Sequence, residues 1–156
     1  MGPYARFVNW FSTTPPGTWL ASRLAARLDP VVYRLSRGRF TSTGPLTIPQ
    51  LVLTTTGRKS GARRTVSLGY LADGDAFVVV ASNFGKSNHP AWSHNLDADP
   101  AASVNVDGRD VGVQAERLDD DDKAAIWPRL VAIIPQFGVY VTRTDRNIKV
   151  YRLRPV

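Results

Sequence analysis

The sequence of 156 residues contains no cysteine. This absence excludes disulfide bonds, thiolate nucleophiles, iron–sulfur clusters and cysteine-based zinc sites. Histidine is almost as scarce, and the five-residue spacing of His89 and His94 does not place both on one helix face. No serine lies in the glycine-flanked pattern of a hydrolase nucleophile. We therefore expect neither a metal site nor nucleophilic catalysis.

Long hydrophobic runs are also missing. No stretch approaches the roughly 20 apolar residues that a membrane-spanning helix needs. The first residues lack the basic start and apolar core of a secretory signal. With 43% hydrophobic and 21% charged residues, the composition is that of a globular protein of one-domain size. We expect a cytoplasmic protein, with a peripheral position on the inner face of the cell membrane left open.

Acidic residues are nearly absent from the first half of the chain. Up to Ala72, ten Lys and Arg residues face a single acid, Asp29, which gives a net charge of +9. From Asp73 onward ten basic and twelve acidic residues give −2. This asymmetry indicates an anionic partner for the first half. Nucleic acid, lipid headgroups and a phosphorylated cofactor all fit the charge equally well.

Hydrophobic periodicity predicts helices at the start of the chain. A first helix spans 3–12, and a proline-rich break separates it from a second helix. The Asp29-Pro30 pair is typical of an N-cap followed by proline at the first helical position. It therefore predicts a short third helix that ends at Gly38. We assign residues 1–40 to an N-terminal helical segment.

The period changes to two after this segment, which predicts strands. The expected strands lie at 50–56, 66–70, 77–82, 103–106, 111–116 and 148–153. Asp73-Gly74 and Asp107-Gly108 are typical hairpin turns. Helices are expected over 88–96 and after Asp119, with Pro128 kinking or restarting the second of these. Hairpin-linked strands with flanking helices predict a mainly β (α+β) domain over 41–156, an antiparallel barrel capped by helices.

The most informative segment is the basic turn at 57–64. It combines two glycines, one hydroxyl and four cations in eight residues. Arginine supplies forked donors, lysine a point charge, and glycine lets the backbone approach a ligand closely. The turn therefore suits phosphates or carboxylates, although its spacing is not that of a P-loop. The alternative is a solvated hairpin turn with no ligand.

The chain offers no acid–base pair for catalysis, so we expect cofactor chemistry if it is an enzyme. Several ordered segments carry a family resemblance: Leu53–Gly61, Val79–Ser82, Asn88–Leu96, Pro100, Trp127–Val131, Pro135, Tyr140 and Thr144–Arg146. Together they resemble the actinobacterial family of deazaflavin (coenzyme F420)-dependent nitroreductases and quinone reductases. The resemblance runs from about Pro49 to the C-terminus and is looser in the N-terminal helices.

The resemblance implies a split β-barrel of the FMN-binding type, adapted to coenzyme F420. It implies a reductase that passes a hydride from the reduced deazaflavin to a quinone or another planar electron-poor substrate, nitro compounds included. The cofactor's phosphate and oligoglutamate tail would rest on Arg58, Lys59, Ser60 and Arg64. The ring would be lined by Val80, Ala81 and Ser82, with Ala91 and Trp92 near the tail. Tyr140 and Ser82 are the candidate proton donors.

The chain departs from the family pattern at several positions. Lysine often stands where this chain has Asn83, so one tail contact is missing or taken over by Lys86. Ser93 stands where tyrosine often follows the tryptophan. Three substrate-side tyrosines of the nitroimidazole-activating enzyme are represented here by Ile134, Phe137 and Tyr140. Cofactor binding is therefore better supported than nitroimidazole reduction.

Two alternative functions remain open. The same barrel suits an FMN-dependent oxidoreductase, and a non-catalytic cofactor or ligand carrier would show the same motifs.

The N-terminal helices combine aromatic residues with several arginines, which favours an anionic membrane surface. The other interpretation is that these helices pack on the barrel. We expect no nucleic-acid partner, because only the charge favours one.

Overall fold

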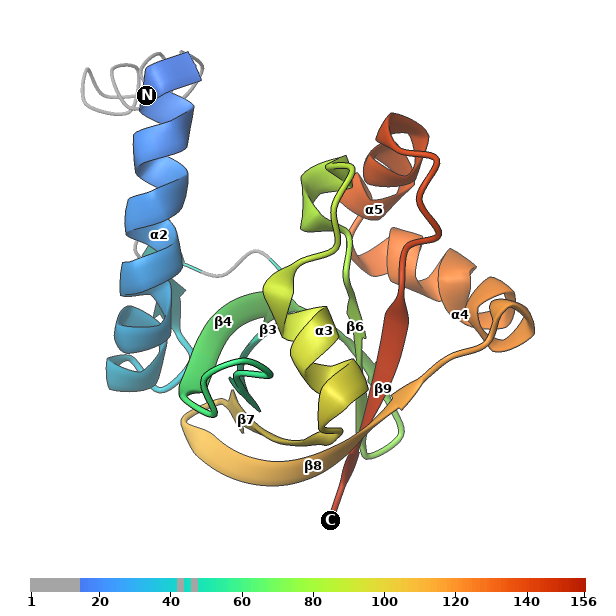
Figure 1. Cartoon of the computed structure of the whole chain (residues 1–156). Helices are drawn as coiled ribbons and strands as arrows, with labels where there is room; N and C mark the ends of the chain where they lie inside the picture. The colour runs from blue at the N-terminus through green and yellow to red at the C-terminus, as the bar shows by residue number, and fades with distance from the viewer. Residues whose placement is uncertain (1–14, 42–43, 46–47) are drawn as a thin grey trace.

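The computed structural model describes residues 15–41, 44–45 and 48–156 (Figure 1). The helix predicted over 3–12, with its aromatic residues, lies outside the described residues. Among the described residues, no helix has both the length and the hydrophobicity required to cross a bilayer.

The first described element is helix α2, Pro15–Leu35. The expected break at Asp29-Pro30 is wrong, because α2 continues through Pro30 as one helix. Pro30 and Tyr33 are buried, and this packing offsets the backbone hydrogen bond that proline cannot donate. The Tyr33 hydroxyl donates to the Gln50 carbonyl at 2.7 Å, which fastens the end of α2 to the barrel. Helix α2 ends at Leu35, and the chain then turns through Gly38, which has a φ of +80°.

The described strands form one curled antiparallel sheet of seven strands in the order β4-β3-β7-β8-β9-β6-β5, together with a separate two-stranded hairpin (Figure 1). The seven are β3 Gln50–Thr56, β4 Arg63–Gly69, β5 Leu71–Asp73, β6 Ala76–Val80, β7 Ala101–Val106, β8 Arg109–Arg117 and β9 Val150–Pro155. The hairpin pairs β1 Phe40–Thr41 with β2 Gly44–Pro45, between α2 and β3 in the chain. Turns occur at both predicted hairpin sites, between β5 and β6 and between β7 and β8. The predicted split β-barrel with antiparallel strands is confirmed.

Three helices flank the sheet: α3 Ala91–Ala98, α4 Asp120–Ile133 and α5 Gln136–Tyr140. Helix α3 begins three residues later than predicted, because Pro90 is extended and serves as its N-cap. Helix α4 does not restart at Pro128. Two 3-10 turns complete the described elements, η1 Asn83–Gly85 and η2 Val141–Arg143.

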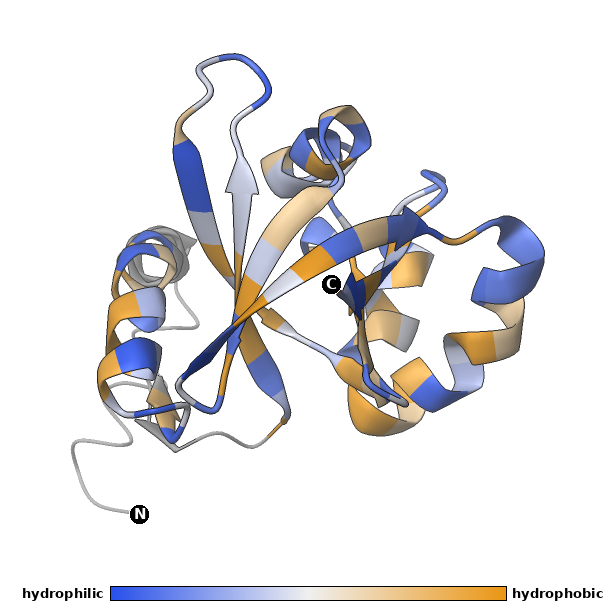
Figure 2. Cartoon of the chain, turned by 90° about the horizontal axis from the view of Figure 1, so that it is seen from below, coloured by the Kyte–Doolittle hydropathy of each residue, from blue (hydrophilic) through white to orange (hydrophobic). Residues whose placement is uncertain are grey.

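The core has two layers that share strand β6. Val79 packs with α3 on the concave side of the sheet, whereas Val78 and Val80 pack with α4 on the other side. Figure 1 shows α3 inside the curl and α4 outside it. Figure 2 shows hydrophobic and hydrophilic bands alternating along strands and helices. Strand β6, which is nearly all apolar, is therefore buried on both faces.

Candidate functional site

The basic turn between β3 and β4 is closed by its own backbone. The Gly57 N–H donates to the Ala62 carbonyl at 2.7 Å, and the Gly61 N–H donates to the Gly57 carbonyl at 2.8 Å. Gly61 has a φ of +71°, a conformation that glycine adopts without strain. The Ser60 hydroxyl accepts from the Ala62 N–H at 3.2 Å. The turn therefore holds its cations on a well-defined backbone.

A pocket of about 620 Å³, here called the basic pocket, opens between this turn and α3. It is lined by Gly57, Arg58, Lys59, Ser60, Arg64, Thr65, Val66, Ala91, Trp92 and Asn95. Within the described ranges, no carboxylate forms an ion pair with Arg58, Lys59 or Arg64, although six ion pairs occur elsewhere. These three cations are therefore available for an anionic ligand.

Asn95 joins α3 to the basic turn. Its side chain is buried, its Oδ1 accepts from the Arg58 N–H, and its Nδ2 donates to the Thr55 hydroxyl, each at 3.1 Å. The sequence did not single out Asn95 as a site residue. The available signal was its place in the Asn88–Leu96 motif.

A second pocket, here called the apolar pocket, has a volume of about 490 Å³. Helices α2, α3 and α5 and strands β4 and β6 contribute to its wall. The lining residues include Ala25, Val66, Leu68, Val80, Ser82, Phe84, Trp92, Phe137 and Tyr140. Val66 and Trp92 line both pockets, so the two spaces adjoin.

The structure divides the predicted site residues between these two pockets. Arg58, Lys59, Ser60, Arg64, Ala91 and Trp92 line the basic pocket. Val80, Ser82 and Tyr140 line the apolar pocket, together with Trp92.

Ala81 and Lys86 stand apart, since neither lines either pocket. Ala81 is fully buried. Its N–H donates to the Lys149 carbonyl at 2.9 Å and its carbonyl accepts from Arg146 at 3.0 Å, so its backbone already bonds within the protein.

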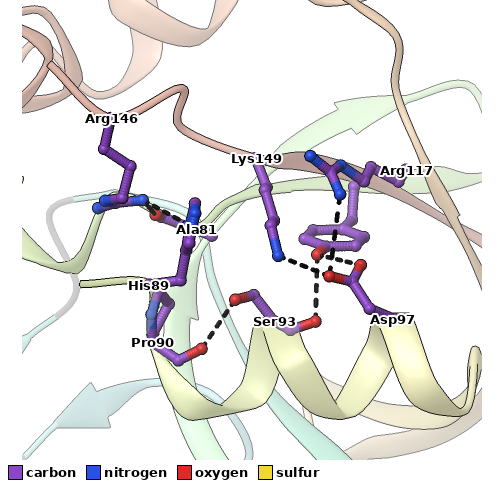
Figure 3. A network of polar contacts seen from close by, with 9 residues as sticks. Ala81, His89, Pro90, Ser93, Asp97, Arg117, Arg146 and Lys149 are labelled. Atoms are coloured by element: carbon purple, nitrogen blue, oxygen red, sulfur yellow. Dashed lines mark hydrogen bonds and ion pairs between the residues drawn. The ribbon is translucent and has the colours of Figure 1, made fainter.

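A polar network behind α3 fixes the helix that carries Trp92 (Figure 3). Asp97 accepts from Lys149 at 2.6 Å and from the Tyr151 hydroxyl at 2.7 Å. Burial raises the pKa of Tyr151, and the hydrogen bond to Asp97 raises it further, so the phenol stays protonated. Burial also acts to raise the pKa of Asp97, but the bonds from Lys149 and Tyr151 outweigh it and lower that pKa overall. The Tyr151 ring meets Trp92 edge-on at 5.7 Å.

The two histidines lie close together near this network. The rings of His89 and His94 meet edge-on with centroids 5.7 Å apart. Burial lowers the pKa of both, and nearby cations lower it further, Lys149 and Arg146 beside His89 and Arg58 and Lys149 beside His94. Both side chains therefore favour the neutral form. The described part of the chain holds no group of three His, Asp or Glu side chains that could bind a metal ion.

Comparisons with known proteins show what this chain is similar to in sequence and in fold. A model of the family described as F420H(2)-dependent quinone reductase matches residues 25–155. An F420H(2)-dependent quinone reductase of Mycobacterium tuberculosis is 42% identical over 127 residues, which cover 80% of this chain and 85% of the relative. A solved F420-H2-dependent reductase superposes with a TM-score of 0.63 at 33% identity and covers 68% of this chain and 94% of its own. A second solved structure, described as a domain-swapped dimer, gives a TM-score of 0.65 at 28% identity over 89% of this chain and 99% of its own.

Proposed function

The chain belongs to the family of F420H(2)-dependent quinone reductases and is an F420-dependent oxidoreductase; from this premise we propose that it reduces a quinone in the apolar pocket while its basic pocket holds the anionic tail of the cofactor. The observation that supports this proposal most directly is that the two pockets adjoin. One is lined by three cations that pair with no carboxylate of the described residues, and the other is largely apolar. A cofactor with a charged tail and a planar ring needs this combination.

The residues of the basic pocket fit such a tail. A phosphate and several carboxylates need a group of fixed cations, which Arg58, Lys59 and Arg64 supply. The hydroxyl of Ser60 adds a neutral hydrogen-bond donor. FMN brings one phosphate, which would leave part of this charge unused, and this favours the deazaflavin over the FMN alternative.

The ring is assigned to the boundary between the pockets. Trp92 and Val66 belong to both linings, and Val80 and Ser82 lie on the apolar side. These side chains exclude water from a planar ligand and orient its face toward the substrate. When bound, the reduced deazaflavin supplies a hydride. The chain's own task is then to align the acceptor and to provide one proton.

The substrate is assigned to the α5 side of the apolar pocket. Phe137 and Tyr140 lie on α5 and Ile134 just before it, and a single hydroxyl among three positions favours a quinone over a nitroimidazole. Tyr140 is half-buried, and its phenol is able to orient a quinone oxygen and donate a proton to it. Ser82, which lines the same pocket, is the second candidate donor.

The proton donor is tested by replacing each hydroxyl. Tyr140→Phe is expected to lower kcat for menadione by about a hundredfold, the low end for loss of general acid catalysis, with the Kd for F420 unchanged. Tyr70→Phe is the matched control, because Tyr70 lines neither pocket. Full activity of Tyr140→Phe combined with Ser82→Ala would leave solvent as the proton source. Undetectable oxidation of F420H2 by menadione in the unaltered protein would contradict the quinone reductase proposal.

A peripheral membrane position is proposed for helix α2. Leu24, Leu28, Val31 and Leu35 recur at spacings of three and four and are exposed, so they form one apolar stripe. Arg27 and Arg34 are exposed on the same helix. Apolar side chains beside arginines suit an anionic lipid surface, and α2 also lines the apolar pocket through Ala25. A lipid-soluble quinone would then enter from the bilayer side.

A further inference from the structure

The segment after β6 is held in an unusual backbone conformation at the wall of the apolar pocket. Asn83, Phe84 and Gly85 follow one another with φ values of +46°, +56° and +74°. Asn83 and Phe84 are not glycines, so this left-handed conformation is strained and persists only where the surroundings impose it. Such strain gathers at ligand-binding and active sites.

Arg146 holds this segment at both ends. Its Nη1 donates to the Ala81 carbonyl at 3.0 Å, its Nη2 to the Ser82 carbonyl at 2.8 Å, and its Nε to the Lys86 carbonyl at 3.2 Å. The same Nη1 lies 2.9 Å from His89 Nδ1 (Figure 3). In the described part of the chain Arg146 forms no ion pair with a carboxylate. The guanidinium thus uses its donors to hold both ends of one loop.

The held segment carries an exposed aromatic ring into the pocket wall. Phe84 is 62% exposed, although it is a large apolar side chain, and it lines the apolar pocket. Its ring meets Tyr140 edge-on, with centroids 5.8 Å apart and planes at 80°. The Arg143 guanidinium lies over the Tyr140 ring at 5.6 Å from its centroid. The Tyr140 ring is therefore held by contacts within the protein, whereas the Phe84 ring remains open to the pocket.

Gly85 lets the segment pack closely on the end of α5 and on η2. A Cβ added at Gly85 would lie 2.7 Å from Arg143 Cβ and 2.8 Å from the Tyr140 carbonyl. The loop therefore packs directly on the stretch that follows α5. Arg146 on one side and this close approach on the other fix where Phe84 lies relative to Tyr140.

We propose that Phe84 is a substrate-binding residue that stacks on or abuts the planar quinone, and that Arg146 is the positioning residue that keeps Phe84 in place. The proposal rests on the proposed function, because it assigns the substrate to the apolar pocket. It adds a residue pair that neither the resemblance nor the relatives assign. A planar electron-poor ring that lies against the open side of Phe84, next to the Tyr140 ring that Phe84 already contacts, gains an aromatic contact without separating this pair.

The full-length protein tests the positioning role without any ligand. Amide hydrogen exchange of a peptide covering 82–89 is expected to be faster in Arg146→Gln than in the unaltered protein. Arg146→Lys should fall between them, because lysine keeps the charge but not the fork of donors. Arg154→Gln is the matched control, since Arg154 is an exposed arginine on β9 that pairs with Glu116 and lines neither pocket. Unchanged exchange in Arg146→Gln would overturn the positioning role.

Kinetics with menadione tests the binding role. Phe84→Ala should raise KM for menadione by about tenfold with the Kd for F420 unchanged, and Phe84→Leu should fall between Phe84→Ala and the unaltered protein. Arg146→Gln should raise the same KM by a similar factor, because it releases the segment that carries Phe84. An unchanged KM in Phe84→Ala would overturn the assignment of Phe84.

If Arg146→Gln fails to fold, Arg146→Lys decides the positioning role and Phe84→Ala decides the binding role. A protein that fails to bind F420 would refute the proposed function, whereas the exchange result would still judge the role of Arg146.

Discussion

Asn95 illustrates how one side chain organises the basic pocket. It accepts from the Arg58 N–H through Oδ1 and donates to Thr55 through Nδ2, so both ends of its amide are used. A neutral amide makes these bonds without adding a negative charge to a pocket that receives anions. No local pattern in the sequence identifies this role, because the partners lie 37 and 40 positions away.

At the scale of single residues, the first prediction concerns the cations of the basic pocket. Lys59→Ala combined with Arg64→Ala is expected to weaken F420 binding by about 1.5 kcal/mol for each cation removed. This is the low end for hydrogen bonds to charged groups, because both side chains are exposed to solvent. Fluorescence titration of F420 measures the effect.

Arg63→Ala is the matched control for this pair. Arg63 adjoins Arg64 in β4, but it lines neither pocket and its Nη2 donates to Ser103 at 3.4 Å. Its replacement should leave the affinity nearly unchanged. An equal decrease of affinity in the control and the double variant would show that the overall positive charge of the turn binds the tail, and not the particular cations that line the pocket.

His89 gives a pH-dependent prediction. Its pKa lies below the ordinary value because burial, Lys149, Arg146, His94 and Arg117 all disfavour the charged ring. Below about pH 6.5 the unfolded chain therefore takes up a proton that the folded chain resists. The free energy of unfolding should fall as the pH drops from about 6.5 through the lowered pKa, and it should level off below that pKa.

The variant His89→Asn tests this linkage. Asparagine keeps an acceptor for Arg146 near the position of Nδ1 but does not titrate. The loss of thermal stability between pH 7.5 and pH 5.5 should be smaller in the variant than in the unaltered protein (roughly the range in which histidine titrates). The same loss in both proteins would contradict the assignment to His89.

Helix α2 shows at the scale of elements where local signals fail. The Asp29-Pro30 pair has the same local pattern at a helix start and inside a long helix, and only tertiary packing decides between them. Here Pro30 and Tyr33 are buried against the barrel, so the helix continues. Helix α3 starts later than expected because Pro90 is extended and serves as its N-cap, and α4 continues through Pro128 without a restart.

The apolar stripe of α2 gives the prediction at this scale. Leu24→Gln combined with Leu28→Gln should reduce co-sedimentation with vesicles that contain anionic lipid, because the pair removes apolar surface without changing the charge. Both leucines are about half exposed, at 49% and 47%, so the fold should tolerate the change. Vesicles of neutral lipid are the control.

Two results would contradict membrane binding by α2. The unaltered protein should sediment with anionic vesicles, and its failure to do so would refute the proposal directly. The second result is a stable dimer in light scattering that the double variant converts to a monomer, with no vesicle binding by either protein. The stripe would then cover a second copy of the chain.

At the scale of the whole molecule, the sheet was predictable and the pockets were only partly so. Period-two patterns and the turns at Asp73-Gly74 and Asp107-Gly108 depend on local chemistry, which a sequence displays directly. The pocket walls depend on how β4, α3 and α5 meet across the curled sheet. Motif residues such as Arg58 and Trp92 were therefore predicted, whereas Phe84 and Arg146 became candidates only through their contacts.

The central claim is that the basic pocket selects a multiply charged deazaflavin. The most direct measurement is an equilibrium titration of the purified protein with F420 and with FMN at low and high salt. The account predicts a micromolar or lower Kd for F420, weaker binding of FMN, and a decrease of F420 affinity with added salt, since exposed charges are screened over about 10 Å at 0.1 M. FMN binding as tight as or tighter than F420 would contradict it.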